Sequence, residues 1–209
     1  MFRNLLNPEN GLMITMTQIT DCIFLSLFWF VGCLPLITAG ASCAALYDAV
    51  WSGFRRHEPR CWKRFFATFS RDLKASLIPT LLLLAALWFG GKGIIGLWNS
   101  AVYGQVSWAV FSGVLFLSMV VIGILSVLFP TLSRFDNPLP VLLRSTVLLS
   151  LANLPRTLAL GILNALTGWL CIRWIFPLFF LPALSCLIST TLLEPMFKPY
   201  MPEDEENAA

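Results

Sequence analysis

The side chains that could do chemistry in this 209-residue sequence are few and scattered. Its one histidine, His57, follows Arg55 and Arg56 in a linker, so no Ser–His–Asp or Cys–His set can be assembled around it. The six cysteines form no CxxC pair and show no metal-ligand spacing. We therefore expect no catalytic residue, no metal site and no cofactor, and a protein that is not an enzyme.

Two ionisable residues lie within apolar stretches, where such residues often have a function. Asp21 is near the start of the first stretch and Lys92 near the end of the second. If both stretches cross a membrane, these ends lie on the same, outer side. Asp21 and Lys92 are then a candidate polar pair, with Arg173 as a second partner for Asp21. The alternative is that all three side chains lie at the lipid headgroups and stay hydrated.

Residues 34–47 are the most informative segment, because a proline is followed by small residues at helical spacing. The proline should kink or end the preceding helix, and the small residues allow close helix approach in a membrane. One interpretation is a re-entrant element or a contact with another membrane subunit. The other is a tight internal turn that packs against its own bundle. The candidate helix-packing or partner-contact residues are Pro35, Thr38, Gly40, Ala41, Ala44, Ala45 and Tyr47.

The elements that carry these residues are expected to be membrane helices. Hydrophobic residues make up 57% of the chain and charged residues 12%, about half of the charged fraction usual in soluble domains. This composition excludes a soluble enzyme, a disordered chain and a nucleic-acid-binding domain, and indicates an all-α integral membrane protein. Five apolar stretches are long enough to span a bilayer, namely 17–37, 76–98, 106–129, 154–172 and 174–193. The last two could also form one unbroken span.

The distribution of charge orients these spans. Most of the 14 Lys and Arg residues lie between spans one and two or between spans three and four, and such loops stay in the cytosol. We therefore expect a plasma-membrane protein with its N-terminus outside and its C-terminus in the cytoplasm. Residues 1–193 should form one polytopic domain, and residues 194–209 an acidic, disordered cytoplasmic tail.

The segment between spans one and two has helical periodicity. Asp48, on its first helix, should lie on the polar face or pair with Arg55 or Arg56. The second helix carries an apolar stripe flanked by basic residues, which suits the cytoplasmic lipid surface; docking to another protein or to the chain's own bundle is the alternative. The candidate residues of this interface helix are Trp62, Phe65, Phe66, Phe69, Arg64 and Arg71.

A similar amphipathic segment, 141–152, precedes span four. Pro79 and Pro155 each fall close to the cytoplasmic start of a span, in its expected first turn. The order amphipathic helix, span, span would then occur twice, as in a parallel duplication. Chance similarity between two helix starts is the alternative.

The runs Thr38-Ala39-Gly40-Ala41 and Ala44-Ala45-Leu46-Tyr47 resemble the signature of the YesL family. This is a group of small bacterial membrane proteins without an established activity, often encoded beside carbohydrate uptake transporters. The resemblance implies a non-enzymatic accessory or regulatory subunit of an ABC-type carbohydrate uptake system. Its partners would be the lipid bilayer and membrane subunits of a sugar transporter, not nucleic acid. The alternatives are a small-solute transporter or channel and a lipid-binding membrane protein.

Overall fold

The computed structural model of the protein describes residues 11–55, 61–104, 107–134, 138–174 and 176–197. Within these residues the chain is helical throughout, with no strand, so the predicted all-α class is confirmed there. The α-helices are α1 (Gly11–Cys33), α2 (Ala39–Arg55), α3 (Cys61–Val102), α4 (Trp108–Arg134), α5 (Leu139–Ala152), α6 (Leu154–Arg173) and α7 (Leu181–Phe197). Two short 3-10 helices, η2 (Leu36–Thr38) and η3 (Phe176–Phe179), connect α1 to α2 and α6 to α7.

Two of these helices, α3 and α4, are long and apolar enough to cross a membrane. The pair α5 and α6, bent by 103° at its break, is a third candidate. Among the described residues, α1 and α7 contribute shorter apolar helices. The protein therefore has two to three candidate spans by length and composition, and their apolar character suits a membrane protein.

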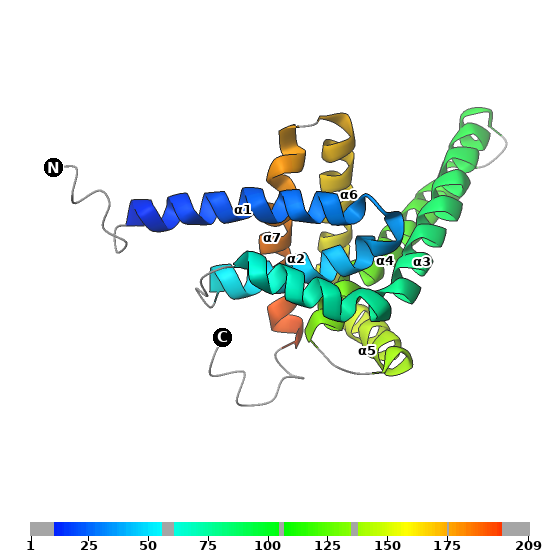
Figure 1. Ribbon diagram of the computed structural model, residues 1–209. Coiled ribbons are helices and arrows are strands. Elements are labelled where there is room, and N and C mark those ends of the chain that lie inside the picture. The colour runs from blue at the N-terminus through cyan, green and yellow to red at the C-terminus, as the bar shows by residue number, and fades with distance from the viewer. Residues whose placement is uncertain (1–10, 56–60, 105–106, 135–137, 175, 198–209) are drawn as a thin grey trace.

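Prolines and a capping asparagine explain where the helices end. α1 stops at Cys33, two residues before Pro35, as the sequence predicts. Asn153 separates α5 from α6, and Pro155 lies in the first turn of α6, where the missing N–H costs nothing. Pro79 differs from the prediction, because it lies inside α3 rather than at the start of a new helix. An internal proline commonly kinks a helix, and in Figure 1 α3 turns upward in its middle.

The helices form a layer with further helices rising from it (Figure 1). α1, α2 and residues 61–76 of α3 lie side by side and form what we name the basal layer. The second part of α3, α4, α6 and α7 rise from this layer, and α5 lies below. α2 contacts α1, α3, α4 and α7. It is therefore the element around which the rest of the chain packs.

The hydrophobic core forms around α2. Leu25 of α1, Phe65 of α3 and Ala183 of α7 are buried together with Ala45 and Ala49. A second cluster joins Tyr47 to buried residues of α4, α5, α6 and α7, namely Val127, Leu149, Leu160, Leu193, Met196 and Phe197. Alanine and glycine are common where helices approach closely, so the small residues of α2 fit a helix surrounded on several sides.

The C-terminal part of the chain has the predicted break after α6, but its last helix departs from the predicted boundaries. Residues 154–193 contain two helices, α6 and α7, rather than one unbroken helix. α7 also continues past Leu193 to Phe197, so residues 194–197 of the predicted tail are helical. The remainder of that tail, 198–209, lies outside the described residues.

Candidate functional site

The predicted contact segment lies mostly inside the protein. Gly40, Ala41, Ala44, Ala45 and Tyr47 are buried, Thr38 is half-buried and Pro35 is exposed. The Thr38 hydroxyl donates to the backbone oxygens of Gly32 and Pro35, which closes the turn between α1 and α2. This geometry is that of an internal turn packed against its own bundle, the second of the two interpretations that the sequence allows.

Gly40 marks the tightest approach of α2 to its neighbours. A Cβ atom built there would meet Thr80 Oγ1 of α3 and would lie 2.6 Å from Phe129 Cε1 of α4. A side chain at this position would therefore push α3 and α4 away from α2. The glycine permits three helices to meet at the start of α2.

Asp48 of α2 is buried, with 4% of its surface exposed, and is bound by α3. Arg64 donates through Nε to Oδ2 at 2.9 Å and through Nη2 to Oδ1 at 3.2 Å. Thr68 Oγ1 donates to the same Oδ2 at 2.5 Å. A two-pronged arginine is a strong partner for a carboxylate. The expectation that Asp48 lies on an exposed polar face is wrong, and Arg64 of the next helix is its partner.

Arg71, held by the buried Asp72, joins α3 to the end of α4. Asp72 is 5% exposed and accepts hydrogen bonds from Arg71 Nε at 2.8 Å and Arg71 Nη2 at 3.2 Å. The same Nη2 donates to the backbone oxygen of Ser133 at 3.1 Å. Both arginines named as interface residues, Arg64 and Arg71, thus bind buried carboxylates with one edge while their side chains stay about half exposed.

A third polar contact joins α2 to α4 and α7. Trp51 Nε1 donates to Glu194 Oε1 of α7 at 2.7 Å, and Arg134 Cζ of α4 lies 3.5 Å from the centre of the Trp51 ring. Burial raises the pKa of the Tyr47 hydroxyl, although the Arg134 guanidinium nearby acts in the opposite direction. Tyr47 therefore stays protonated at neutral pH.

We name the Asp48, Asp72 and Trp51 contacts together the basal junction.

The aromatic residues of the predicted interface helix point in two directions. Phe65 is buried and Phe69 half-buried, and their rings stack 6.2 Å apart. Trp62 and Phe66 are exposed. The start of α3 therefore packs on the chain's own bundle with one face and presents aromatic and basic side chains with another.

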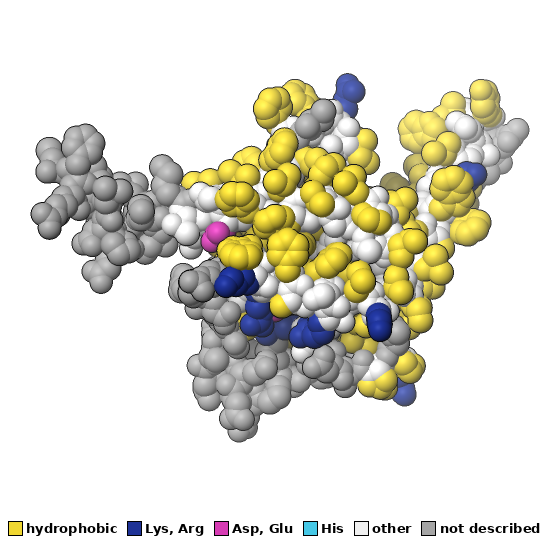
Figure 2. Space-filling model, viewed as in Figure 1, with side chains coloured by type: hydrophobic (Ala, Val, Ile, Leu, Met, Phe, Trp, Pro, Cys, Tyr) yellow, Lys and Arg dark blue, Asp and Glu magenta, His cyan; other side chains and the backbone are white. Residues whose placement is uncertain are grey.

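Basic residues gather along one edge of the molecule. Figure 2 shows dark blue side chains along the lower edge of a broad hydrophobic surface, with other basic groups at the upper ends. Exposed basic residues of α3 and α5 supply the basic rim, which consists of Lys63, Arg64, Arg71, Lys74 and Arg144. Such a border between apolar and basic surface is typical of the boundary of a membrane.

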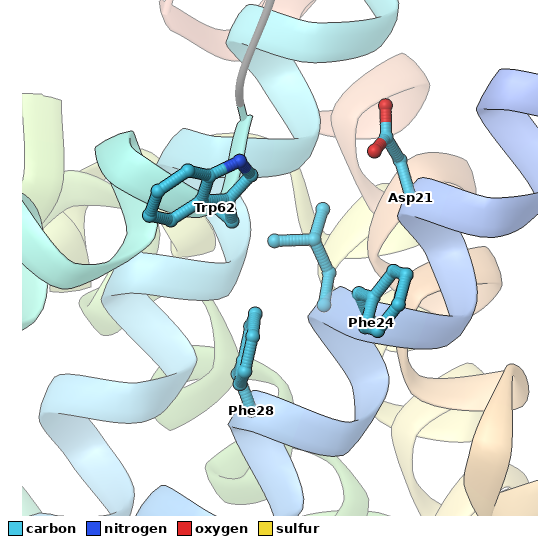
Figure 3. Close-up of a pocket in the computed structure, with 5 residues that line it drawn as sticks. Asp21, Phe24, Phe28 and Trp62 are labelled. Carbon is cyan, nitrogen blue, oxygen red and sulfur yellow. The ribbon is translucent and has the colours of Figure 1, made fainter.

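Asp21 lies in a small pocket between α1 and the start of α3. The pocket measures about 240 Å³ and is lined by Asp21, Phe24, Leu25, Phe28 and Trp62. Figure 3 shows the Asp21 carboxylate at one side of the pocket, Trp62 across from it, and the two phenylalanines between and below them. Cys61 Sγ donates a hydrogen bond to Asp21 Oδ2 at 3.8 Å.

The structure does not bring Asp21 and Lys92 together. Asp21 touches Cys61, the first residue of α3, whereas Lys92 is far along the same helix. At 1.5 Å per residue this separation is roughly 45 Å along the helix axis. Lys92 Nζ lies instead 4.5 Å from the ring centre of Trp88.

Sequence reasoning missed several residues that hold the helices together. Asp72 binds Arg71 of its own helix, which in turn reaches the backbone of α4, and Glu194 binds Trp51 of α2. Gly123 and Gly161 allow α4 and α6 to cross at close range. The small-residue signal of the two glycines is visible in the sequence, but their pairing is not. Among the described residues, no group of three or more His, Cys, Asp and Glu side chains is placed to hold a metal ion.

Comparison with known proteins gives one family. A family described as "Protein of unknown function, DUF624" matches residues 22–90, which cover most of α1, all of α2 and α3 as far as Gly90. No curated protein and no solved structure matches the chain. The matched region contains the segment 34–47 and the Asp48 and Asp72 contacts, and it is consistent with the YesL-type resemblance of the sequence.

Proposed function

We propose that this protein is a non-enzymatic accessory or regulatory subunit that binds the membrane subunits of an ABC-type carbohydrate uptake system. The carbohydrate association comes from the YesL-type resemblance. The contact with a membrane partner rests on one structural feature, the hairpin of α3 and α4. We name residues 81–102 of α3 and 108–118 of α4 the arm.

The arm carries the proposal because it is apolar and barely packed. In the most apolar part of α3, 6% of the residues are buried within the chain. Figure 1 shows the arm rising apart from α6 and α7. Gly90, Gly91, Gly93 and Gly96 of the arm have open space around them, with nothing within 4 Å of a Cβ atom built at each. Glycine costs about 1 kcal/mol relative to alanine within a helix, and in membranes it permits close approach of another helix. These glycines serve no packing purpose within the described chain, and contact with a partner helix would give them one.

The hydroxyl groups of the apolar helices favour this role over transport by the protein alone. Ser118, Ser126 and Thr167 donate to backbone oxygens of their own helices, at 2.7 to 2.8 Å. Thr80 does the same at 2.6 Å. A transporter requires polar groups directed at its substrate near the middle of the membrane, and these groups are engaged with the backbone.

The membrane arrangement that we propose places the basic rim at the cytoplasmic face of the plasma membrane. The sequence predicts five crossings, and the arrangement depends on α1. Asp21 contacts Cys61, Phe28 contacts Phe65 and Phe66, and Gly32 lies against Phe69. α1 therefore runs alongside the start of α3, the segment that carries most of the basic rim. We propose that α1 lies along the inner boundary and that α3, α4, α6 and α7 make four crossings.

Copurification tests the function. The tagged full-length protein, extracted in mild detergent from its native membrane, should bring down the membrane subunits of a carbohydrate uptake system, identified by mass spectrometry. Gly93→Leu in the arm should abolish this recovery. Gly168→Leu is the matched control, because Gly168 of α6 also has nothing within 4 Å of a built Cβ atom but lies outside the arm.

Three results would contradict the proposal. Recovery of this chain without transporter subunits would contradict the proposed partner. Equal recovery of those subunits with Gly93→Leu would show that the arm is not the contact. Uptake of labelled sugar by liposomes that contain only the purified protein would identify a transporter instead.

A further inference from the structure

The Asp21 pocket differs from the basal junction in one respect. Asp48 and Asp72 each have an arginine within 3.2 Å. The Asp21 carboxylate accepts a hydrogen bond from the Cys61 thiol at 3.8 Å, which is a weak donor, and no described Lys or Arg forms an ion pair with it. A half-buried carboxylate beside apolar side chains is costly without a cation. The pocket therefore suits a positively charged group that the described residues do not supply.

The walls of the pocket favour a particular kind of cation. Three aromatic residues line the pocket with Asp21, with Trp62 across from the carboxylate and Phe24 and Phe28 below it (Figure 3). Aromatic faces together with a carboxylate attract organic ammonium groups, whose charge is spread over a partly apolar surface. A volume of about 240 Å³ has room for such a group but not for a large solute. The chemistry indicated is that of an alkylammonium head.

The surroundings indicate that this head belongs to a lipid. Lys63 Nζ lies 5.5 Å from the ring centre of Trp62, which lines the pocket, and we assign to it an anionic group next to the ammonium. Phe24 of the pocket is exposed, as is Phe66, whose ring lies 5.1 Å from that of Phe28, and the two offer an apolar surface to acyl chains. An ammonium group, an adjacent phosphate and apolar chains are the parts of a zwitterionic aminophospholipid.

We propose that this pocket binds the headgroup of an aminophospholipid such as phosphatidylethanolamine. Asp21 binds the ammonium, Phe24, Phe28 and Trp62 surround it, and Lys63 binds the phosphate, with the acyl chains against the adjacent apolar surface. The inference is independent of the proposed accessory role, since it concerns α1 and the start of α3 rather than the arm.

Lipid titration of the delipidated full-length protein in detergent, followed by native mass spectrometry, tests this site. The probes are short-chain phosphatidylethanolamine, short-chain phosphatidylglycerol, which lacks the ammonium, and decylamine, which lacks the phosphate. Phosphatidylethanolamine should bind roughly tenfold more tightly than phosphatidylglycerol, as expected for one charge contact. Asp21→Asn should remove that difference. Lys63→Gln should weaken the binding of phosphatidylethanolamine but leave the binding of decylamine unchanged.

Tryptophan variants keep the test independent of any folding defect in Asp21→Asn. Trp62 is exposed at the pocket, and Trp174 is exposed after α6, so both can be changed without opening the core. Trp62→Leu should weaken phosphatidylethanolamine binding several-fold, and Trp174→Leu should not. Unchanged binding in both Asp21→Asn and Trp62→Leu would overturn the site. If decylamine binds as tightly as phosphatidylethanolamine and Lys63→Gln has no effect, the ligand is a free amine and the assignment to a lipid is overturned.

Discussion

At the scale of single residues, two acidic groups that are buried or half-buried are held by partners from other helices. Asp48 is held by Arg64 and Thr68, and Glu194 by Trp51. A carboxylate taken out of water must be paired, and breaking such a pair costs more than its formation gains. These contacts therefore act mainly to fix which helix faces which, and α2 cannot slide along α3 without separating Asp48 from Arg64.

Asp48→Asn should lower the stability of the protein. The amide keeps the shape of the side chain but loses the charge that binds Arg64 and one acceptor of the basal junction. We expect a loss of about 1–3 kcal/mol, because Arg64 is partly exposed and can recover hydration. The measurement is the midpoint of thermal unfolding in detergent. Asp21→Asn is the matched control, since no arginine among the described residues pairs with Asp21, and equal midpoints for the two variants would refute the role of the pair.

At the scale of elements, the sequence predicts the positions of helices along the chain better than their directions in space. The predicted span 154–172 corresponds to α6 at Leu154–Arg173, and the segment 141–152 to α5 at Leu139–Ala152, because Asn153 and Pro155 give clear local signals. The continuity of α3 through Pro79 could not be predicted, because a proline signals a helix start as readily as a kink. Hydropathy cannot distinguish an apolar helix that crosses a membrane from one that lies across other helices. For this reason the direction of α1 could not be predicted from the sequence. Nor does spacing along α2 reveal that Asp48 binds Arg64 of α3.

The crossing of α4 and α6 gives a prediction at this scale. A Cβ atom at Gly161 would lie 2.7 Å from the backbone oxygen of Met119, and a backbone oxygen cannot move aside as a side chain can. Gly161→Ala should therefore force the two helices apart and lower stability by about 1–3 kcal/mol. Gly168→Ala, on the same helix but in open space, should be neutral or slightly stabilising. The comparison of their unfolding midpoints checks this, and a midpoint for Gly161→Ala at or above that of Gly168→Ala would show that the crossing tolerates a side chain.

At the scale of the whole molecule, the order of elements occurs twice. The start of α3 lies in the basal layer and is followed by one helix rising and one returning (α3 and α4); α5 is followed in the same way by α6 and α7 (Figure 1). This order is the one expected from the two proline-marked segments, and the duplication itself stays a hypothesis. The two halves differ at their bends, since Pro79 lies within a continuous helix and Pro155 begins a new one. The two helices outside this repeated order, α1 and α2, form the basal layer together with the start of α3.

The position of the N-terminus tests this whole-molecule arrangement. With α1 along the inner boundary and four crossings, both ends of the chain lie in the cytoplasm; with five crossings, the N-terminus lies outside. Protease-cleavable tags placed before Met1 and after Ala209 should both be cut in inverted membrane vesicles and not in intact spheroplasts. A tag after Gly104, between α3 and α4, is the control and should be cut only from outside, because the proposed arrangement puts the basic rim, at the opposite ends of these helices, in the cytosol. Cleavage of the N-terminal tag in spheroplasts would show that α1 crosses the membrane, and α1 could then not run beside the basic start of α3. Cleavage of the Gly104 tag only in inverted vesicles would show that the orientation is the reverse of the proposed one. The basic rim would then not determine the orientation.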